Sequence, residues 1–333
     1  MVLFPLNNRN FASQNKCPIH STMNNKNYTG HLCMLIASIA WGLMSPIGKD
    51  IMGTEVTALS LATFRMVGGA VCFWIASLFT KHEEVKPHDL MMLFFAALFA
   101  IVFNQGLFIF GLSLTSPINA SIITTMAPIA TMILAAIYLR EPVTGKKVGG
   151  VFLGAIGALI LIIGSSGHGG KDSSIWGDVL CFIAQVSFAA YLTFFKDLVT
   201  KYSPITCMKW MFTYASMCFI PFSYRQVSSL PFSEISTGTW GEIAFVVIGA
   251  TFMTFLLLMV AQKILRPTVL SMYNYTQPII ASIVSVIIGL GTFGWLKGLA
   301  VVLVFAGVYL VTQSKSRAQM LQEKEKSPDT IKK

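Results

Sequence analysis

Long apolar runs alternate with short polar segments along almost the whole chain. A helix that crosses the hydrocarbon core of a bilayer needs about 20 mostly apolar residues. Ten such runs cover residues 32–52, 56–79, 90–111, 117–139, 148–164, 177–195, 204–222, 240–262, 267–290 and 293–312. The pattern predicts an all-α integral membrane protein with ten transmembrane helices in a lipid bilayer.

The composition agrees with helices that face lipid instead of water. Of the 333 residues, 54% are hydrophobic and 11% are charged, whereas soluble domains carry roughly 25% charged residues. The net charge of +10 would indicate nucleic-acid binding if the basic residues covered one folded face. Because they lie at the ends of the apolar runs and in the terminal segments, we expect no nucleic-acid partner.

The basic residues also orient the predicted helices. If both termini are cytoplasmic, 18 of the 24 Lys and Arg residues lie inside, four lie outside and two lie within apolar runs. Cytoplasmic loops of membrane proteins carry an excess of Lys and Arg. The sequence therefore predicts a protein of the plasma membrane or bacterial inner membrane with both termini in the cytoplasm.

The two halves of the chain resemble each other. A shift of 150 residues aligns two prolines of the fourth run with two of the ninth, and a shift of 147 aligns two Lys-Asp pairs. These matches are Pro117 with Pro267, Pro128 with Pro278, and Lys49-Asp50 with Lys196-Asp197. Chance similarity between apolar helices is the alternative, but it does not explain the shared spacing. Since each half holds five spans, an odd number, the copies are predicted to be inverted repeats, as in alternating-access transporters.

This repeat predicts the organisation of the chain. The expected segments are a disordered cytoplasmic head (1–29), a first five-helix repeat (30–165), an extracytoplasmic linker (166–175), a second repeat (176–314) and a charged cytoplasmic tail (315–333).

The paired prolines predict helix kinks at Pro128 and Pro278. Proline has no amide hydrogen, so the carbonyl groups of Thr124 and Asn274 lose their helical partners. In the middle of a membrane, an unpaired carbonyl needs another polar group or water. We therefore expect the fourth and ninth helices to border a wet cavity.

Uncharged polar residues lie deep within several runs. We interpret the carboxamides as cavity groups, because they are costly against lipid, and the serines as helix-packing residues. The polar residues predicted to contact a substrate are Asn104, Gln105, Thr124, Thr125, Gln185, Asn274 and Gln277. Trp41, Tyr191 and Tyr273 are predicted to stack on a flat substrate, with packing or interface anchoring as the alternative.

Arg65 lies about nine residues into its run, about 14 Å deep at the rise of an α-helix. A charge at that depth costs roughly 2.5–3.5 kcal/mol on insertion scales, so the side chain must face protein or water. It either contacts a carboxylate or phosphate of a substrate, or it serves as a structural cation bonded to neighbouring carbonyl groups. The sequence leaves both readings open.

Carboxylates are absent from the deep part of the runs. Proton relays usually use buried carboxylates or histidine. The sequence therefore predicts facilitated or exchange transport, or coupling through an acid at a helix end, and poor recognition of bare cations.

Several short motifs resemble those of EamA-type transporters in the drug/metabolite transporter superfamily. They are Trp41-Gly42 with Ser45-Pro46, Phe64-Arg65, Thr115-Ser116 leading to Ala127-Pro128, and Leu139-Arg140-Glu141-Pro142. The resemblance covers roughly residues 30–314, one unit per half. One position departs from the family pattern, because Gly291 stands where a second acid would match Glu141. A gating role that needs an acid in both halves is therefore not expected.

The resemblance implies a ten-helix bundle whose central cavity is lined by helices one to four and six to nine. It also implies export of small organic metabolites, such as amino acids or related amphipathic solutes, by alternating access. A nucleotide-sugar-like exchanger is the alternative within the wider superfamily, and a channel or a membrane scaffold is a more distant one.

Other classes fit less well. Gly164-Ser165-Ser166-Gly167 resembles the serine motif of an intramembrane protease, but no histidine base follows His168. The zinc-protease motif H-E-x-x-H is also missing. We therefore expect no enzyme, catalytic residue, cofactor or metal. A seam of Gly149, Gly150, Gly154 and Gly157 in the fifth run is predicted to pack either on the tenth helix or on a second subunit, as a homodimer through helices five and ten.

Overall fold

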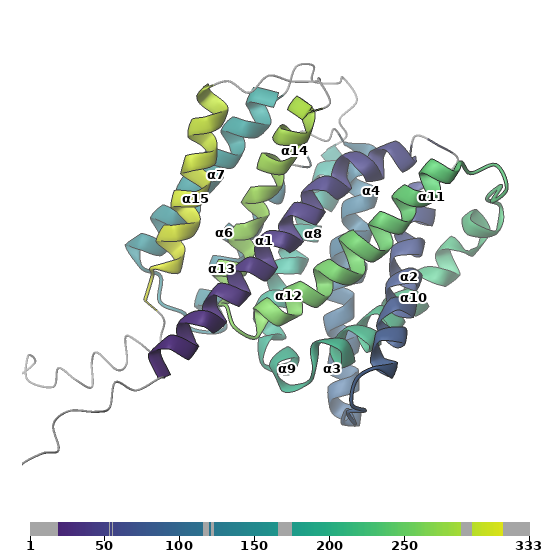
Figure 1. Ribbon diagram of the computed structural model, residues 1–333, viewed down its shortest axis with the longest axis horizontal. Coiled ribbons are helices and arrows are strands. Elements are labelled where there is room, and N and C mark those ends of the chain that lie inside the picture. Colours follow the sequence, from purple (N-terminus) through teal and green to yellow (C-terminus); the bar gives the residue numbers. More distant parts are fainter. Residues whose placement is uncertain are drawn as a thin grey trace, which may run out of the picture.

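The computed structural model describes residues 19–52, 54, 56–115, 120, 123–165, 175–287 and 295–315, and every regular element in these ranges is a helix (Figure 1). Most of the predicted head and tail, and residues 166–174 of the linker, lie outside them. α1 begins at Ile19, so residues 19–29 are helical, although the sequence placed them in a disordered head.

The first half of the chain contains seven described helical elements. They are α1 (Ile19–Met52), α2 (Ala58–Leu78), α3 (Pro87–Ala97), η1 (Leu98–Gly106), α4 (Leu107–Leu114), α6 (Ala127–Ile137) and α7 (Gly145–Ser165). The second half contains α8 (Ile175–Phe194), α9 (Lys196–Lys201), α10 (Pro204–Ser228), α11 (Thr237–Ala244), η2 (Phe245–Met253), α12 (Thr254–Gln262), α13 (Pro267–Met272), η3 (Tyr273–Tyr275), α14 (Thr276–Ile287) and α15 (Trp295–Thr312).

Short polar segments start several of these helices. The side chains of Thr57, Ser203 and Ser236 accept hydrogen bonds from backbone amides in the first turns of α2, α10 and α11. Pro87 and Pro204 are the first residues of α3 and α10. Proline is favoured there because the first amide of a helix has no intrahelical partner.

Four helical stretches in the described part of the chain have the length and apolar composition needed to cross a membrane. They are Ala58–Leu78, Pro87–Leu114, Ile175–Phe194 and Thr237–Gln262. The structure thus shows an all-helical protein with several apolar helices of membrane length. Other predicted spans fall on helices that are broken, such as α13–η3–α14, or that adjoin residues outside the described ranges.

The helices run back and forth between two faces of the bundle (Figure 1). We call the face where α1 begins and α15 ends the terminus face, and the other the far face. α1 runs from the terminus face to the far face, whereas α8, which opens the second half, starts at the far face and ends at the terminus face.

Two π-helical segments occupy equivalent places in the two halves. Leu98–Gly106 interrupts the helix formed by α3 and α4, and Phe245–Met253 interrupts the helix formed by α11 and α12. Both contain nine residues, and they lie 147 residues apart, the shift that aligns the Lys-Asp pairs. Since π-helical segments are rare and concentrate at functional sites, their repetition supports a duplicated architecture.

The helices that carry the paired prolines are both interrupted. α13 ends at Met272, one 3₁₀ turn follows, and α14 begins at Thr276 with Pro278 in its first turn. In the first half, a turn at residues 125–126 precedes α6, and Pro128 is the second residue of that helix. Each interruption therefore lies directly before its proline. The proline then stands in the first turn of the next helix, where a backbone amide has no intrahelical partner to lose.

The glycine seam of α7 packs against α15 of the same chain. A Cβ atom on Gly150 would lie 2.7 Å from the carbonyl oxygen of Gly307, and one on Gly157 would lie 2.7 Å from that of Ala300. Such close backbone approach requires glycine. The seam is thus used by the tenth helix, and the homodimer through helices five and ten stays a prediction.

Candidate substrate cavity

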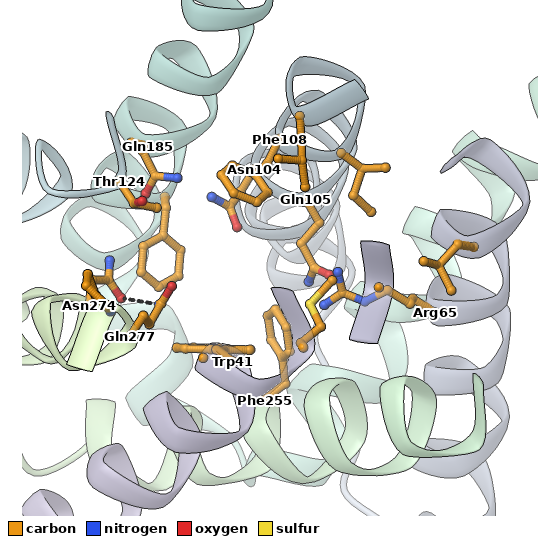
Figure 2. A pocket seen from close by; sticks show the side chains of 18 of the residues that line it. Trp41, Arg65, Asn104, Gln105, Phe108, Thr124, Gln185, Phe255, Asn274 and Gln277 are labelled. Atoms are coloured by element: carbon orange, nitrogen blue, oxygen red, sulfur yellow. Dashed lines mark hydrogen bonds between the residues drawn. The ribbon is translucent and has the colours of Figure 1, made fainter. Parts of the chain in front are cut away.

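A cavity of about 140 Å³ lies in the centre of the bundle, where α1, α2, η1, α4, α8, α12, η3 and α14 meet (Figure 2). Of the two prolines predicted to kink their helices, Pro278 borders this cavity and Pro128 does not. Eight of the eleven residues predicted to contact a substrate line it, namely Trp41, Arg65, Asn104, Gln105, Thr124, Gln185, Asn274 and Gln277.

Three predicted contact residues do not line this cavity. Thr125 is buried in the turn before α6. Tyr191 is fully buried one turn beyond the cavity wall, and its hydroxyl donates to Sδ of Met259 at 3.3 Å. Tyr273 faces a separate groove beside α1 and α15, where its hydroxyl lies 2.8 Å from Nδ1 of His31. The 3₁₀ turn directs the neighbouring Asn274 into the cavity instead.

Phenylalanine side chains that the sequence reasoning missed form much of the cavity wall. The ring of Trp41 meets the rings of Phe188 and Phe255 edge to face, at centroid distances of 6.3 Å and 6.1 Å. Phe108 also lines the cavity. The repeat contained a signal for them, because the shift of 147 residues aligns Trp41 with Phe188 and Phe108 with Phe255.

Arg65 is buried, with 3% of its surface exposed. Its Nε donates to Oγ1 of Thr251 at 3.0 Å, and that hydroxyl donates to the carbonyl oxygen of Val246 at 2.8 Å. Within the described residues, no carboxylate lies within ion-pair distance of the guanidinium. Arg65 therefore joins α2 to η2 through a bond to a side-chain hydroxyl, and whether it contacts a substrate or is a structural cation stays a prediction.

The carboxamides of the cavity differ in their partners. Asn104 donates to the carbonyl oxygen of Ala184 at 3.0 Å, and Gln277 donates to Oδ1 of Asn274 at 3.4 Å. The side chain of Gln105 is 6% exposed, and in the described structure neither of its polar atoms has a hydrogen-bond partner. In Figure 2 the carboxamide of Gln105 points toward the guanidinium of Arg65, and both lie across the cavity from Asn274 and Gln277.

The cavity continues toward the far face and is closed toward the terminus face. Residues at the far ends of α1, α2 and α4 line it, and their counterparts 147 residues later are buried, with at most 5% exposed. The counterpart pairs are Met44 with Tyr191, Gly48 with Phe195, Met52 with Val199, Leu61 with Met208, and Leu112 with Met259. Within the described residues, the cavity thus extends along the far half of the central path, and the equivalent positions in the terminus half are packed.

Polar contacts between the two halves close the terminus face. Asp89 accepts hydrogen bonds from Nζ of Lys201 and the hydroxyl of Tyr202, both at 2.5 Å. Glu83 accepts one from the amide of Ser203 at 2.8 Å. The bond to Asp89 raises the pKa of Lys201, which is the last residue of α9. We call Glu83, Asp89, Lys201, Tyr202 and Ser203 the terminus-face latch.

A buried ion pair within the first half also contacts the second half near the same face. Oε2 of Glu141 lies 2.6 Å from Nζ of Lys147 and accepts from Oγ1 of Thr268 at 3.4 Å. All three residues are buried. The predicted counterpart position, Gly291, lies outside the described ranges. Glu141 thus has a structural partner on each side of the repeat boundary.

A family model matches the chain twice. The model of the EamA-like transporter family matches residues 28–163 and again residues 175–313. The chain belongs to the EamA-like transporter family. The resemblance predicted from the short motifs is thereby confirmed, and the chain is a membrane transporter with duplicated halves.

Relatives of this EamA-like transporter occur in distant organisms. It is 27% identical over 263 residues to "Uncharacterized transporter YyaM" of Bacillus subtilis. The matched region covers 78% of this chain and 86% of YyaM. It is 28% identical over 201 residues to an "Uncharacterized transporter" of Archaeoglobus fulgidus, covering 60% and 69%. It is 29% identical over 142 residues to "WAT1-related protein At4g01440" of Arabidopsis thaliana, covering 41% and 38%.

The fold of this EamA-like transporter also occurs in a solved crystal structure. The two superpose with a TM-score of 0.68 over 92% of this chain and 99% of the other, at 14% sequence identity. At that identity the likeness concerns the fold alone.

Proposed function

We propose that this EamA-like transporter exports small organic metabolites, such as amino acids or related amphipathic solutes, by alternating access through the central cavity. The proposal includes ten transmembrane helices in two inverted five-helix repeats, residues 30–165 and 176–314. The observation that carries it is the asymmetry of the central path among the described residues: the cavity extends toward the far face, and the equivalent positions toward the terminus face are packed.

Three structural features support inverted repeats. α1 and α8 run in opposite directions, the π-helical segments recur 147 residues apart, and both halves break their fourth helix before a proline. In such a pair, equivalent residues of the two halves lie on opposite sides of the membrane centre. Exchanging their open and packed arrangements would open the terminus face and close the far face.

The distribution of basic residues supports an orientation with the terminus face in the cytoplasm. In this orientation the cavity of the structure faces outward. A solute that had entered from the cytoplasm would leave from this state, and rebuilding the terminus-face latch would prevent its return.

The size of the cavity favours a small solute over the nucleotide-sugar alternative. Its volume of about 140 Å³ lies below the roughly 300–1,000 Å³ of pockets that hold drug-sized ligands. A channel is disfavoured because the described helices pack the terminus side of the path closed, and no pore-lining ring crosses it. A scaffold would not require buried amides around a cavity.

The test compares metabolites released by cells with and without overexpression of the protein, followed by counterflow in liposomes with the metabolites that change most. We expect unlabelled metabolite inside the vesicles to accelerate uptake of the labelled one, because a carrier returns faster when loaded. Flux without counterflow would indicate a channel. No difference in released metabolites and no counterflow with any of them would reject the transport proposal.

A further inference from the structure

We infer that the substrate is a small organic anion with a flat apolar body, and that its anionic group binds between Arg65 and Gln105. This inference rests on the proposed transport function and narrows its substrate class. It starts from the charges and unpaired polar groups around the central cavity.

The cavity wall carries one unbalanced positive charge. Arg65 is buried, and its side-chain partner among the described residues is the neutral hydroxyl of Thr251. A guanidinium has five N–H donors, so several remain for a ligand. Among the described residues that line the cavity, none is Asp or Glu. Because an uncompensated buried charge is strongly unfavourable, an anionic ligand would find its counter-charge already in place.

Gln105 adds a second, independent indication. Its carboxamide is buried and has no partner within the described structure for either polar atom, whereas buried amides are nearly always hydrogen-bonded. Gln105 and Arg65 line the same cavity, and in Figure 2 the amide of Gln105 points toward the guanidinium of Arg65. A carboxylate or phosphate oxygen between them would accept from both side chains, and such charge-assisted bonds are the strong ones.

The rest of the cavity determines the other parts of the ligand. Trp41, Phe188 and Phe255 form aromatic walls between the Arg65 end and the opposite end, and they suit a flat apolar body. Asn274 and Gln277 lie at the opposite end and are bonded to each other. They can bind an uncharged polar group, but they provide no counter-charge for an ammonium group. Anions should therefore bind better than zwitterions of the same shape, and cations should bind worst.

The experiment uses four ligands of nearly the same shape. 3-Phenylpropionate is an anion, 3-phenylpropionamide is its neutral analogue, phenylalanine is a zwitterion and 3-phenylpropylamine is a cation. Their affinities are measured by calorimetry on the purified full-length protein in detergent. We expect the anion to bind at least about tenfold more tightly than the amide and the amine, since bonds to charged groups discriminate by roughly that factor.

Variants assign this preference to the two side chains. Arg65→Gln should reduce the ratio of anion to amide affinity to within about twofold, and Gln105→Leu should weaken the anion about tenfold. Arg65→Lys, which keeps the charge, should retain part of the preference. Arg225→Gln, an exposed arginine at the end of α10, is the matched control and should change nothing. Because Arg65→Gln also removes the contact with Thr251, the ligand series on the wild-type protein decides the question even if this variant does not fold.

Two results would overturn the inference. One is equal binding of the anion, the amide and the amine to the wild-type protein, or binding of none of the four. The other is a folded Arg65→Gln variant that keeps the preference for the anion. Counterflow of a neutral or cationic metabolite would leave the transport proposal standing while it removed the anion site. Anion-selective binding without any counterflow would support the anion site and reject the transport proposal.

Discussion

The hydroxyl of Thr251 makes two hydrogen bonds at the centre of the protein. It accepts a hydrogen bond from Nε of Arg65 and donates one to the carbonyl oxygen of Val246, five residues earlier. The second bond holds the oxygen in place within the π-helical segment, so that its lone pair meets the guanidinium. The position of the buried charge thus depends on a neutral side chain in the opposite half of the chain.

Replacing Thr251 by valine should therefore destabilise the protein by about 1–3 kcal/mol, because a buried donor of Arg65 loses its partner. Thr193→Val is the matched control. Thr193 is also fully buried, but its hydroxyl donates to the carbonyl oxygen of Ala189 within its own helix. That carbonyl keeps its helical partner, so the control should change stability by less than about 0.5 kcal/mol. Thermal unfolding in detergent measures both, and equal melting temperatures would contradict the assignment.

At the residue level, the cost of a polar group against lipid was the criterion that pointed to the cavity. Asn104, Gln185 and Gln277 were selected for that reason, and they line the cavity. The criterion missed Phe188 and Phe255, because an apolar ring suits lipid, packing and a ligand equally. Tyr191 and Tyr273 were selected as stacking groups, but the residue type does not show which side of a helix borders the cavity, and at Tyr273 the helix break also shifts the register.

At the scale of whole helices, the tightest interface joins α7 and α15. Gly150 and Gly307 bring the two backbones together, so that a Cβ atom on Gly150 would lie 2.7 Å from the carbonyl oxygen of Gly307. A Cβ atom on the neighbouring Gly149 would meet no other described atom within 4 Å. Two adjacent glycines of one helix therefore differ only in the face that they present.

Gly150→Ala should force α7 and α15 apart and destabilise the protein by about 1–3 kcal/mol, the range found for overpacking. Gly149→Ala should be neutral or stabilise the helix by up to about 1 kcal/mol, because alanine is the better helix former. Thermal unfolding in detergent distinguishes the two. If both variants melted like the wild-type protein, the close contact between these helices would be disproved.

The elements themselves could be predicted from the sequence to different degrees. The long apolar runs and the repeat predicted the α-helical class, and the prolines predicted the positions of the two breaks. The π-helical segments could not be predicted, because Leu98–Gly106 and Phe245–Met253 contain no proline and remain apolar throughout most of their length. Their conformation depends on tertiary contacts such as the one between Thr251 and Arg65.

For the whole molecule, the difference between the two halves of the path rests on a few positions. Gly48 lines the open side, where a Cβ atom would meet only ordinary contacts at 3.8 Å, while its counterpart Phe195 fills the closed side. A phenylalanine at position 48 would have room to enter the open side and would make it resemble the closed one.

Gly48→Phe should therefore close the path to the far face. The measurement is the labelling rate of a cysteine at position 112 by a membrane-impermeant thiol reagent, in a background without the native cysteines. We expect the rate for Leu112→Cys to fall about tenfold or more with Gly48→Phe and to change little with Gly48→Ala. An unchanged rate with phenylalanine would show that position 48 does not border the path.

We expect the latch to keep the terminus face closed, and its strength can be measured through the accessibility of position 259. In the structure Leu112 lines the cavity and its counterpart Met259 is fully buried, so a cysteine at 112 should react at least about tenfold faster than one at 259.

Asp89→Asn removes the charge that binds Lys201 and Tyr202. Bonds to charged groups contribute about 1.5–3 kcal/mol, and about 1.4 kcal/mol corresponds to a tenfold change in population. The substitution should therefore raise labelling at 259 from the terminus side about tenfold, whereas Asp197→Asn, at an exposed acid of α9, should leave it unchanged. Equal labelling of Met259→Cys with and without Asp89 would mean that packing of Tyr191 and Phe195, and not the latch, keeps this face closed.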